Sequence, residues 1–257
     1  MLTVDSISKS FGGLTAVNSC SFTIESQSIT GLIGPNGAGK TTIFNVIAGA
    51  MKPDGGRVQF QGMDITGQPA HTLFHLGIMR TFQIPQEFFA MTVLENLMVV
   101  PAKQSGENLF YALLSPGNVA AREKEVRERA IDVLDFLRLT HVIDELAGNL
   151  SGGQKKLLEL GRAMMADPDI VLLDEPGAGV NPTLLGELAE MIERLNKERH
   201  YTFCIIEHNM DMIARLCDPV IVMVEGGVLM QGDMDTVRAD PRVLDAYLGG
   251  DIHVAPN

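Results

Sequence analysis

Glycines and a lysine in residues 34–41 are spaced in a way that suits the binding of an anion. The segment reads G-P-N-G-A-G-K-T, with an apolar stretch just before it and a helix-compatible stretch just after it. Gly34, Gly37 and Gly39 lack Cβ atoms, so the backbone can turn sharply and aim successive N–H groups at one anion. A helix beginning near Lys40 adds unpaired N–H groups and the positive end of its dipole. The segment therefore predicts a phosphate loop for a nucleoside triphosphate with Mg²⁺, rather than a glycine-rich surface turn.

Each residue of this loop has an expected place in the nucleotide site. We expect Lys40 to reach the β- and γ-phosphates, where it would also assist the reaction, and Thr41 to bind Mg²⁺. The neighbouring residues complete the cradle around the phosphates. The expected nucleotide-binding residues of the loop are Gly34, Pro35, Asn36, Gly37, Ala38, Gly39, Lys40, Thr41 and Thr42.

A pair of acidic residues ends a second apolar segment. Residues 170–173 read I-V-L-L and are followed by Asp174 and Glu175. Such strand ends are where open α/β sheets gather ligands. We expect Asp174 to bind Mg²⁺ through water, and Glu175 to orient or deprotonate the water that attacks the γ-phosphate. Two acids before Pro176 would by themselves also suit a polar turn, but the phosphate loop in the same chain favours the catalytic interpretation.

The segment L-S-G-G-Q at 150–154 is the third motif. Ser151 suits a helix N-cap, and Gly152 and Gly153 leave backbone N–H groups open to an approaching anion. By itself this pattern indicates a well-capped helix. Its position between the phosphate loop and the acidic pair adds four residues to the predicted nucleotide site, namely Ser151, Gly152, Gly153 and Gln154.

The elements that must position these motifs change in character along the chain. The first 35 residues and the segment 56–60 alternate like short strands, which predicts a small sheet. Residues 92–100 and 120–139 carry apolar residues at helical spacing, which predicts a helical insertion. Strands and helices then alternate to the C-terminal region, and this predicts a mostly parallel sheet covered on both faces. The helices and strands expected after the insertion are a helix at 151–166, a strand at 170–173, a helix from Pro182, a strand at 201–206 and a helix from Met210.

Composition and charge exclude several classes of function. The 257 residues include 32 acidic and 20 basic side chains, and the net charge of −12 repels a nucleic-acid backbone. The three cysteines are widely spaced without a C-x-x-C pair, which indicates reduced structural thiols. The N-terminal residues lack the pattern of a signal peptide, and no run of 18 apolar residues occurs. We expect a cytoplasmic protein that reaches the inner face of the membrane through partner subunits.

With these motifs in this order, the chain resembles the nucleotide-binding subunits of ATP-binding-cassette transporters. The resemblance adds a glutamine loop at Gln83 and a switch histidine at His208. It implies that Gln83 contacts Mg²⁺ and water, that His208 contacts the γ-phosphate, and that Glu175 and Lys40 act with them in ATP hydrolysis. It also implies a head-to-tail dimer, in which the Ser151 segment of one chain closes over ATP held by a second cassette, identical or related.

The resemblance also carries an expected fold and domain organisation. The fold class is α/β, a P-loop nucleoside triphosphatase (RecA-like) mixed sheet with an N-terminal antiparallel β-subdomain and an inserted α-helical subdomain. We expect residues 1–83 and 160–235 to form the nucleotide-binding core. Residues 84–159 form the helical subdomain, and residues 236–257 form a C-terminal helix and tail.

Departures from the family pattern narrow the expected function. Phe11 stands where most members stack a tyrosine on adenine, and we expect Val17 beside the base. The loop at 176–182 reads P-G-A-G-V-N-P instead of the usual S-A-L-D, so the usual intersubunit Asp contact is in doubt. This loop and residues 206–210 and 246–249 are similar to the cassettes of branched-chain amino-acid importers.

The predicted function is therefore ATP hydrolysis that powers uptake of branched-chain or other hydrophobic amino acids. The expected partners are integral membrane permease subunits and, indirectly, a periplasmic solute-binding protein. Alternatives are a lipopolysaccharide-export ATPase, an importer cassette for urea or another small solute, and, disfavoured by the acidic charge, a non-transport cassette that handles nucleic acid. Residues 84–89, with Phe88 and Phe89, are a candidate partner surface together with the helical insertion, unless these rings pack in the core.

Overall fold

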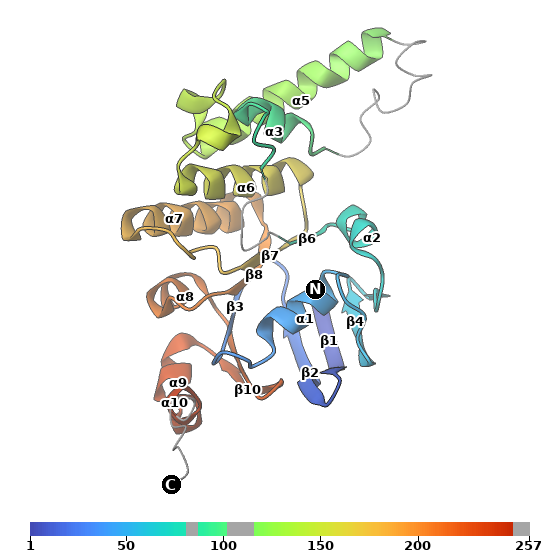
Figure 1. Ribbon diagram of the computed structural model, residues 1–257, viewed down its shortest axis with the longest axis vertical. Helices are drawn as coiled ribbons and strands as arrows, with labels where there is room; N and C mark the ends of the chain where they lie inside the picture. The colour runs from blue at the N-terminus through green and yellow to red at the C-terminus, as the bar shows by residue number, and fades with distance from the viewer. Residues whose placement is uncertain (81–86, 102–115, 249–257) are drawn as a thin grey trace. The chain divides into compact units, whose positions relative to one another are not determined.

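The computed structural model describes residues 1–80, 87–101 and 116–248, and the chain divides into two compact units. Unit 1 comprises Met1–Gln83, Asp169–Ala178 and Leu185–Asn257. Unit 2 comprises Ile84–Pro168 and Gly179–Leu184. Helix α7 (Pro182–Arg199) begins in unit 2 and continues in unit 1. Figure 1 follows the chain through the described elements.

A six-stranded sheet forms the centre of unit 1, with the strand order β10-β9-β3-β8-β7-β6. The neighbouring strands are parallel except that β10 runs antiparallel to β9. Every residue of β3, β7 and β8 is buried, as expected for central strands that are covered on both faces. The strands are β3 (Ile29–Ile33), β6 (Ile78–Arg80), β7 (Ile170–Asp174), β8 (Thr202–Ile206), β9 (Val220–Val224) and β10 (Gly227–Gly232).

A second, antiparallel sheet of unit 1 has the strand order β2-β1-β4-β5. Its strands are β1 (Leu2–Phe11), β2 (Leu14–Ile24), β4 (Gly55–Phe60) and β5 (Met63–Asp64). Apolar side chains of this sheet and of the first helix share one buried cluster, which includes Leu2, Phe22, Phe44 and Phe60. The predicted N-terminal sheet extended to residue 35, whereas β3 joins the six-stranded sheet because it is apolar on both of its faces.

Among the described residues, six helices lie wholly or mostly in unit 1. Polar residues of the predicted nucleotide site lie just before α1, α7 and α8 in the sequence. Helices α9 and α10 follow the last strand. Besides α7, the helices are α1 (Lys40–Ile47), α2 (Ala70–His75), α8 (Met210–Leu216), α9 (Met234–Ala239) and α10 (Pro241–Leu248). Of the predicted C-terminal segment 236–257, the described residues 236–248 belong to unit 1, and residues 249–257 lie outside the described residues.

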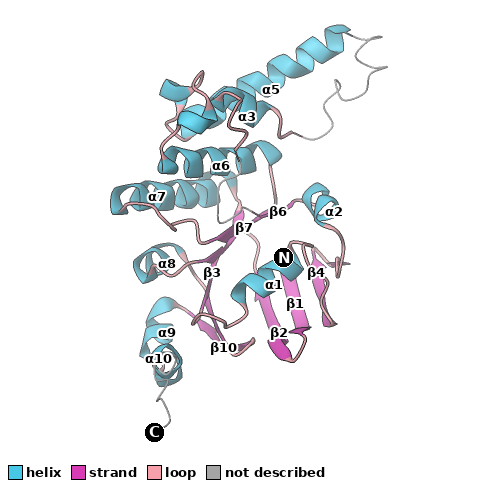
Figure 2. Ribbon diagram, viewed as in Figure 1, coloured by secondary structure: helices cyan, strands magenta, loops and turns pink. Residues whose placement is uncertain are grey.

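Unit 2 is built from helices joined by loops, as Figure 2 shows for its described residues. They are α3 (Val93–Met98), α5 (Pro116–Phe136) and α6 (Gly152–Ala166), with short 3₁₀ turns at Thr140–Val142 and Ala147–Asn149. Gly161 lets α6 approach its neighbours, because a Cβ there would lie 2.8 Å from Leu137 and 3.1 Å from Leu97. This packing keeps all of α6 in the helical unit. Unit 2 thus continues to Pro168, whereas the predicted helical subdomain ends at residue 159.

Candidate nucleotide site

The loop between β3 and α1 depends on glycine for two different reasons. Gly34, Gly37 and Gly39 have φ angles of 149°, 81° and 95°, a region that favours glycine. A Cβ at Gly34 would lie 2.1 Å from the Met223 carbonyl oxygen, and one at Gly39 would lie 2.4 Å from that of Ala16. Nothing lies within 4 Å of a Cβ at Gly37, so only its φ angle requires glycine. Neighbouring backbone segments thus leave no room for a side chain at Gly34 or Gly39.

The N-terminus of α1 is free of side-chain capping. Its N-cap residue Gly39 is in the left-handed conformation and makes no side-chain cap hydrogen bond, so no side chain of the cap residue occupies the first N–H groups of the helix. Ala38 is buried and anchors the loop, since its carbonyl accepts a hydrogen bond from the Gly226 N–H at 3.2 Å. Asn36, Gly37 and Thr41 are exposed, whereas Pro35 and Thr42 are half-buried.

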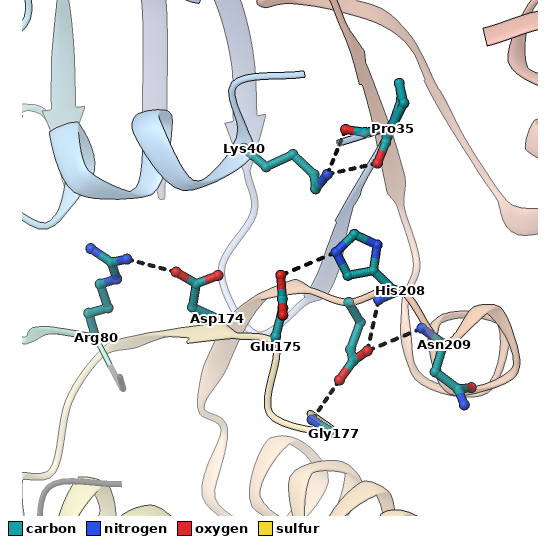
Figure 3. A network of polar contacts seen from close by, with 10 residues as sticks. Pro35, Lys40, Arg80, Asp174, Glu175, Gly177, His208 and Asn209 are labelled. Carbon is teal, nitrogen blue, oxygen red and sulfur yellow. Dashed lines mark hydrogen bonds and ion pairs between the residues drawn. The ribbon is translucent and has the colours of Figure 1, made fainter. Parts of the chain in front are cut away.

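Lys40 folds back over the loop that precedes it. Its side chain is buried, and Nζ donates to the carbonyl oxygens of Gly34 at 2.7 Å and Pro35 at 3.0 Å (Figure 3). Burial lowers the pKa of Lys40, and the nearby charges of Glu175 and Asp174 oppose that shift. The ammonium therefore lies within electrostatic reach of both acids.

Asp174 ends β7 and is almost fully buried, at 5% exposure. Its Oδ2 forms an ion pair with Nη2 of Arg80 at 2.7 Å, and the same guanidinium donates to the side-chain oxygen of Asn45 in α1. Arg80 is the last residue of β6, so it ties an edge strand to both the acidic pair and the helix after the loop. Arg80 was not predicted from the sequence, because one arginine after two apolar residues carries no local signal.

Glu175 occupies a strained turn directly after β7. Its φ angle is 51°, which is uncommon for a residue with a side chain, and its N–H donates to the Ile206 carbonyl at 2.8 Å. Its Oε1 lies 3.1 Å from Nε2 of His208, which follows β8. Figure 3 shows the two side chains directed at each other, with Lys40 and Asp174 in the same group of polar residues. The structure thus brings together four residues that the sequence assigned to the reaction.

These residues fit the phosphates of a nucleotide and its metal ion. The glycine-lined loop, the uncapped α1 terminus and the buried Lys40 suit a polyanion. Thr41 and Asp174 carry oxygen atoms, which are the ligands that Mg²⁺ prefers. Gln83, the third predicted Mg²⁺ ligand, lies outside the described residues.

The L-S-G-G-Q segment belongs to unit 2 and begins α6. Ser151 and Gln154 form a reciprocal capping box, in which each side chain accepts a hydrogen bond from the backbone N–H of the other, at 3.4 and 3.0 Å. Gly152 is exposed and has no atom within 4 Å of a built Cβ. Gly153 differs, because a Cβ there would lie 1.5 Å from Leu184. Packing against Leu184 therefore favours glycine at this position, and the contact of Gly153 with a nucleotide stays a prediction.

The two residues predicted to contact adenine have different environments. Phe11 lies at the end of β1, is 45% exposed, and has Nζ of Lys9 5.8 Å from its ring centroid. Val17 is fully buried, and its side chain packs behind Gly39. Val17 therefore packs beneath the loop, and its contact with the base stays a prediction.

Two family models match this chain. The one described as ABC transporter matches residues 17–178, and the one described as branched-chain amino acid ATP-binding cassette transporter matches residues 228–253. The chain belongs to the ATP-binding-cassette transporter family. The cassette is therefore an ATPase, as the sequence predicted. None of its described helices is long and apolar enough to cross a membrane.

Relatives and solved structures align with nearly the whole cassette. The probable branched-chain amino acid transport ATP-binding protein LivG of Archaeoglobus fulgidus is 44% identical over 249 residues, 97% of this chain and 95% of that protein. The high-affinity branched-chain amino acid transport ATP-binding protein BraF of Pseudomonas aeruginosa is 37% identical and covers 97% and 98%. A solved ABC transporter cassette in its ADP conformation has a TM-score of 0.82 at 40% identity and covers 97% and 98%. The predicted P-loop fold class is confirmed.

Proposed function

We propose that this cassette hydrolyses ATP, with Mg²⁺ as its cofactor, to power the uptake of branched-chain or other hydrophobic amino acids. Relatives at 37% and 44% identity carry names of branched-chain amino acid transport proteins, and residues 228–253 match a family model with that description. The Glu175–His208 contact at 3.1 Å, beside Lys40 and Asp174, is the observation that carries the hydrolytic part of the proposal.

Each residue of the site has a role that follows from its position. Lys40 would exchange its two loop carbonyls for phosphate oxygens, so the loop is held in shape before the nucleotide arrives. Glu175 would accept the proton of the attacking water, and His208 would orient the Glu175 carboxylate and contact the γ-phosphate. Thr41, Asp174 and Gln83 would hold Mg²⁺, which when bound supplies positive charge to the phosphates.

A second cassette, identical or related, would complete the working enzyme as a head-to-tail dimer. Ser151, Gly152 and Gln154 lie at the N-terminus of a 15-residue helix, which is suited to face a phosphate of the partner's nucleotide. Integral membrane permease subunits would carry the solute, with a solute-binding protein delivering it from the periplasm. Phe88 and Phe89 of unit 2 are 46% and 63% exposed, and we propose them as part of the surface that meets the permease.

The proposal is tested by replacing Glu175 with Gln, which keeps the size of the side chain but removes the base. We expect ATP to bind with near-normal affinity while hydrolysis falls by about 10²-fold or more. An ATP-bound dimer should accumulate, as measured by light scattering after gel filtration. Lys40→Ala is the matched control, since it should weaken binding of the triphosphate itself. Undiminished hydrolysis by the Glu175→Gln protein would remove this residue from the mechanism.

A further inference from the structure

Three consecutive residues at the end of β8 contact the turn that carries Glu175. The Ile206 carbonyl accepts the Glu175 N–H at 2.8 Å, and Nε2 of His208 meets Oε1 of Glu175 at 3.1 Å. Between them, Oε1 of Glu207 accepts the Gly177 N–H at 2.6 Å. The residues at the end of β8 thus hold the turn that follows β7 and carries Glu175.

The Glu207 carboxylate is buried and joins two loops. Only 4% of the residue is exposed, and Oε2 accepts the N–H groups of His208 at 2.8 Å and Asn209 at 3.1 Å. Within residues 1–80, 87–101 and 116–248, no Lys, Arg or His forms an ion pair with it. Burying an unpaired charge is costly unless hydrogen bonds replace the lost hydration, and here three backbone donors do so.

We propose that Glu207 is a positioning residue for ATP hydrolysis, and that it holds the Glu175 turn at a fixed distance from His208. This inference rests on the proposed roles of Glu175 and His208. One carboxylate oxygen binds the turn after Glu175, and the other binds the segment that begins with His208. Because a carboxylate is rigid and planar, neither loop can shift without breaking a charge-assisted hydrogen bond.

The surroundings of the carboxylate leave little room for another arrangement. A Cβ at Gly177 would lie 2.5 Å from Oε1 of Glu207, so a side chain at that position would displace the carboxylate. Asn209 in turn caps α8 by accepting the Met212 N–H at 2.9 Å. The strained φ angle of Glu175 persists because hydrogen bonds hold the backbone at two points, at the Glu175 N–H and at the Gly177 N–H.

Replacing Glu207 with Gln tests the proposal with almost no change in shape. The amide has one acceptor oxygen, so its NH₂ group must face either Gly177 N–H or the His208 and Asn209 N–H groups, donor against donor. Asp233→Asn is the matched control. Asp233 caps α9 by accepting the Thr236 N–H at 2.8 Å, and asparagine caps helices equally well.

The first measurement is amide hydrogen exchange in the nucleotide-free protein. We expect exchange at Gly177, His208 and Asn209 to become about tenfold faster or more in Glu207→Gln, and to be unchanged in Asp233→Asn. The second measurement is steady-state hydrolysis, where kcat should fall by about tenfold while the KM for ATP with Mg²⁺ stays within about twofold. A residue that only stabilised the fold would not speed exchange at these three amides alone, and it would not lower kcat while leaving KM unchanged.

Several outcomes would overturn the proposal. Unchanged exchange would mean that the three hydrogen bonds do not hold the loops, and unchanged kcat with faster exchange would mean that they do not serve the reaction. If Glu207→Gln does not fold, Gly177→Ala keeps the charge and displaces the carboxylate, and it should give the same loss of kcat. In a Glu175→Gln background, Glu207→Gln should cause no further loss. If Glu175→Gln alone is fully active, the proposed catalytic role of Glu175 fails, whereas the exchange result still reports on Glu207.

Discussion

At the scale of single residues, two charged side chains that we expect to bind ligand are paired with other groups of the protein. Nζ of Lys40 is bonded to two carbonyls of its own loop, and the Asp174 carboxylate is bonded to Arg80. In each case the charge is satisfied within the protein, so no buried charge is left without a partner at these two positions. Binding of ATP and Mg²⁺ would therefore exchange one set of contacts for another.

Buried thiols give unit 1 a pH dependence that can be measured at one cysteine. Burial raises the pKa of Cys20 from 9.0 to about 12. The folded state thus keeps a proton that the unfolded chain loses above pH 9, and the stabilising contribution of this thiol is lost as pH rises toward 12. Between pH 9 and 10 the free energy of unfolding should fall by about 1 kcal/mol more in the wild type than in Cys20→Ala.

Urea unfolding under reducing conditions at pH 8, 9 and 10 measures this difference. Comparison of the two proteins cancels the other groups that titrate in this range. Equal slopes of stability against pH in the two proteins would contradict the burial of the Cys20 thiol.

At the scale of elements, two helices of unit 2 begin with a capping box. Thr92 and Glu95 form a capping box at α3, as Ser151 and Gln154 do at α6. Local hydrogen bonding is therefore comparable at the two helix starts, but only the second lies in the motif that we expect to meet a nucleotide. This pair separates the structural role of a cap from its functional role.

Ser151→Ala and Thr92→Ala should each lower the stability of the protein by about 0.5–2 kcal/mol, because each removes an N-cap acceptor. Only Ser151→Ala should also weaken the ATP-dependent dimer, which is measured by gel filtration in the Glu175→Gln background. Equal effects of the two substitutions on the dimer would show that Ser151 acts only as a helix cap.

At the scale of the whole molecule, exposed apolar side chains mark a surface that the fold leaves uncovered. Phe88 and Phe89 lie next to cationic side chains, with the guanidinium of Arg162 5.1 Å from one ring and the ammonium of Lys155 5.2 Å from the other. The alternative that these rings fill the core is not supported, since both are exposed in unit 2. An apolar surface with a basic rim suits a protein partner.

Replacing both Phe88 and Phe89 with Ser should leave ATP binding by the purified cassette unchanged, because neither residue belongs to the nucleotide site. In cells that depend on this chain, uptake of labelled leucine should fall by about tenfold or more, since hydrolysis would no longer drive the permease. Leu244→Ser is the matched control, as it changes a side chain in α10 that is 52% exposed. Loss of ATP binding, or normal uptake, would count against this surface.

Most of the chemistry in this chain could be predicted from residues that are close together in the sequence. The phosphate loop, the acidic pair after β7 and the Ser151 cap are local patterns, because the backbone geometry that each one requires is set within a few residues. The α/β fold followed from the alternation of apolar segments. Local patterns did not indicate what packing set, such as the burial of Val17 and the place of α6 in unit 2.

What only the tertiary structure decided is how separate motifs are held against each other. Arg80 meets Asp174 across β6 and β7, and Glu207 meets Gly177 across the ends of β8 and β7. A sequence pattern carries no signal for such pairs, because their separation along the chain is unrelated to their distance in space. The sequence by itself determined which groups are able to bind and cleave a nucleotide. The folded sheet determined their spacing, since parallel strands deliver their carboxyl ends, and the buried charges that follow them, to the same edge.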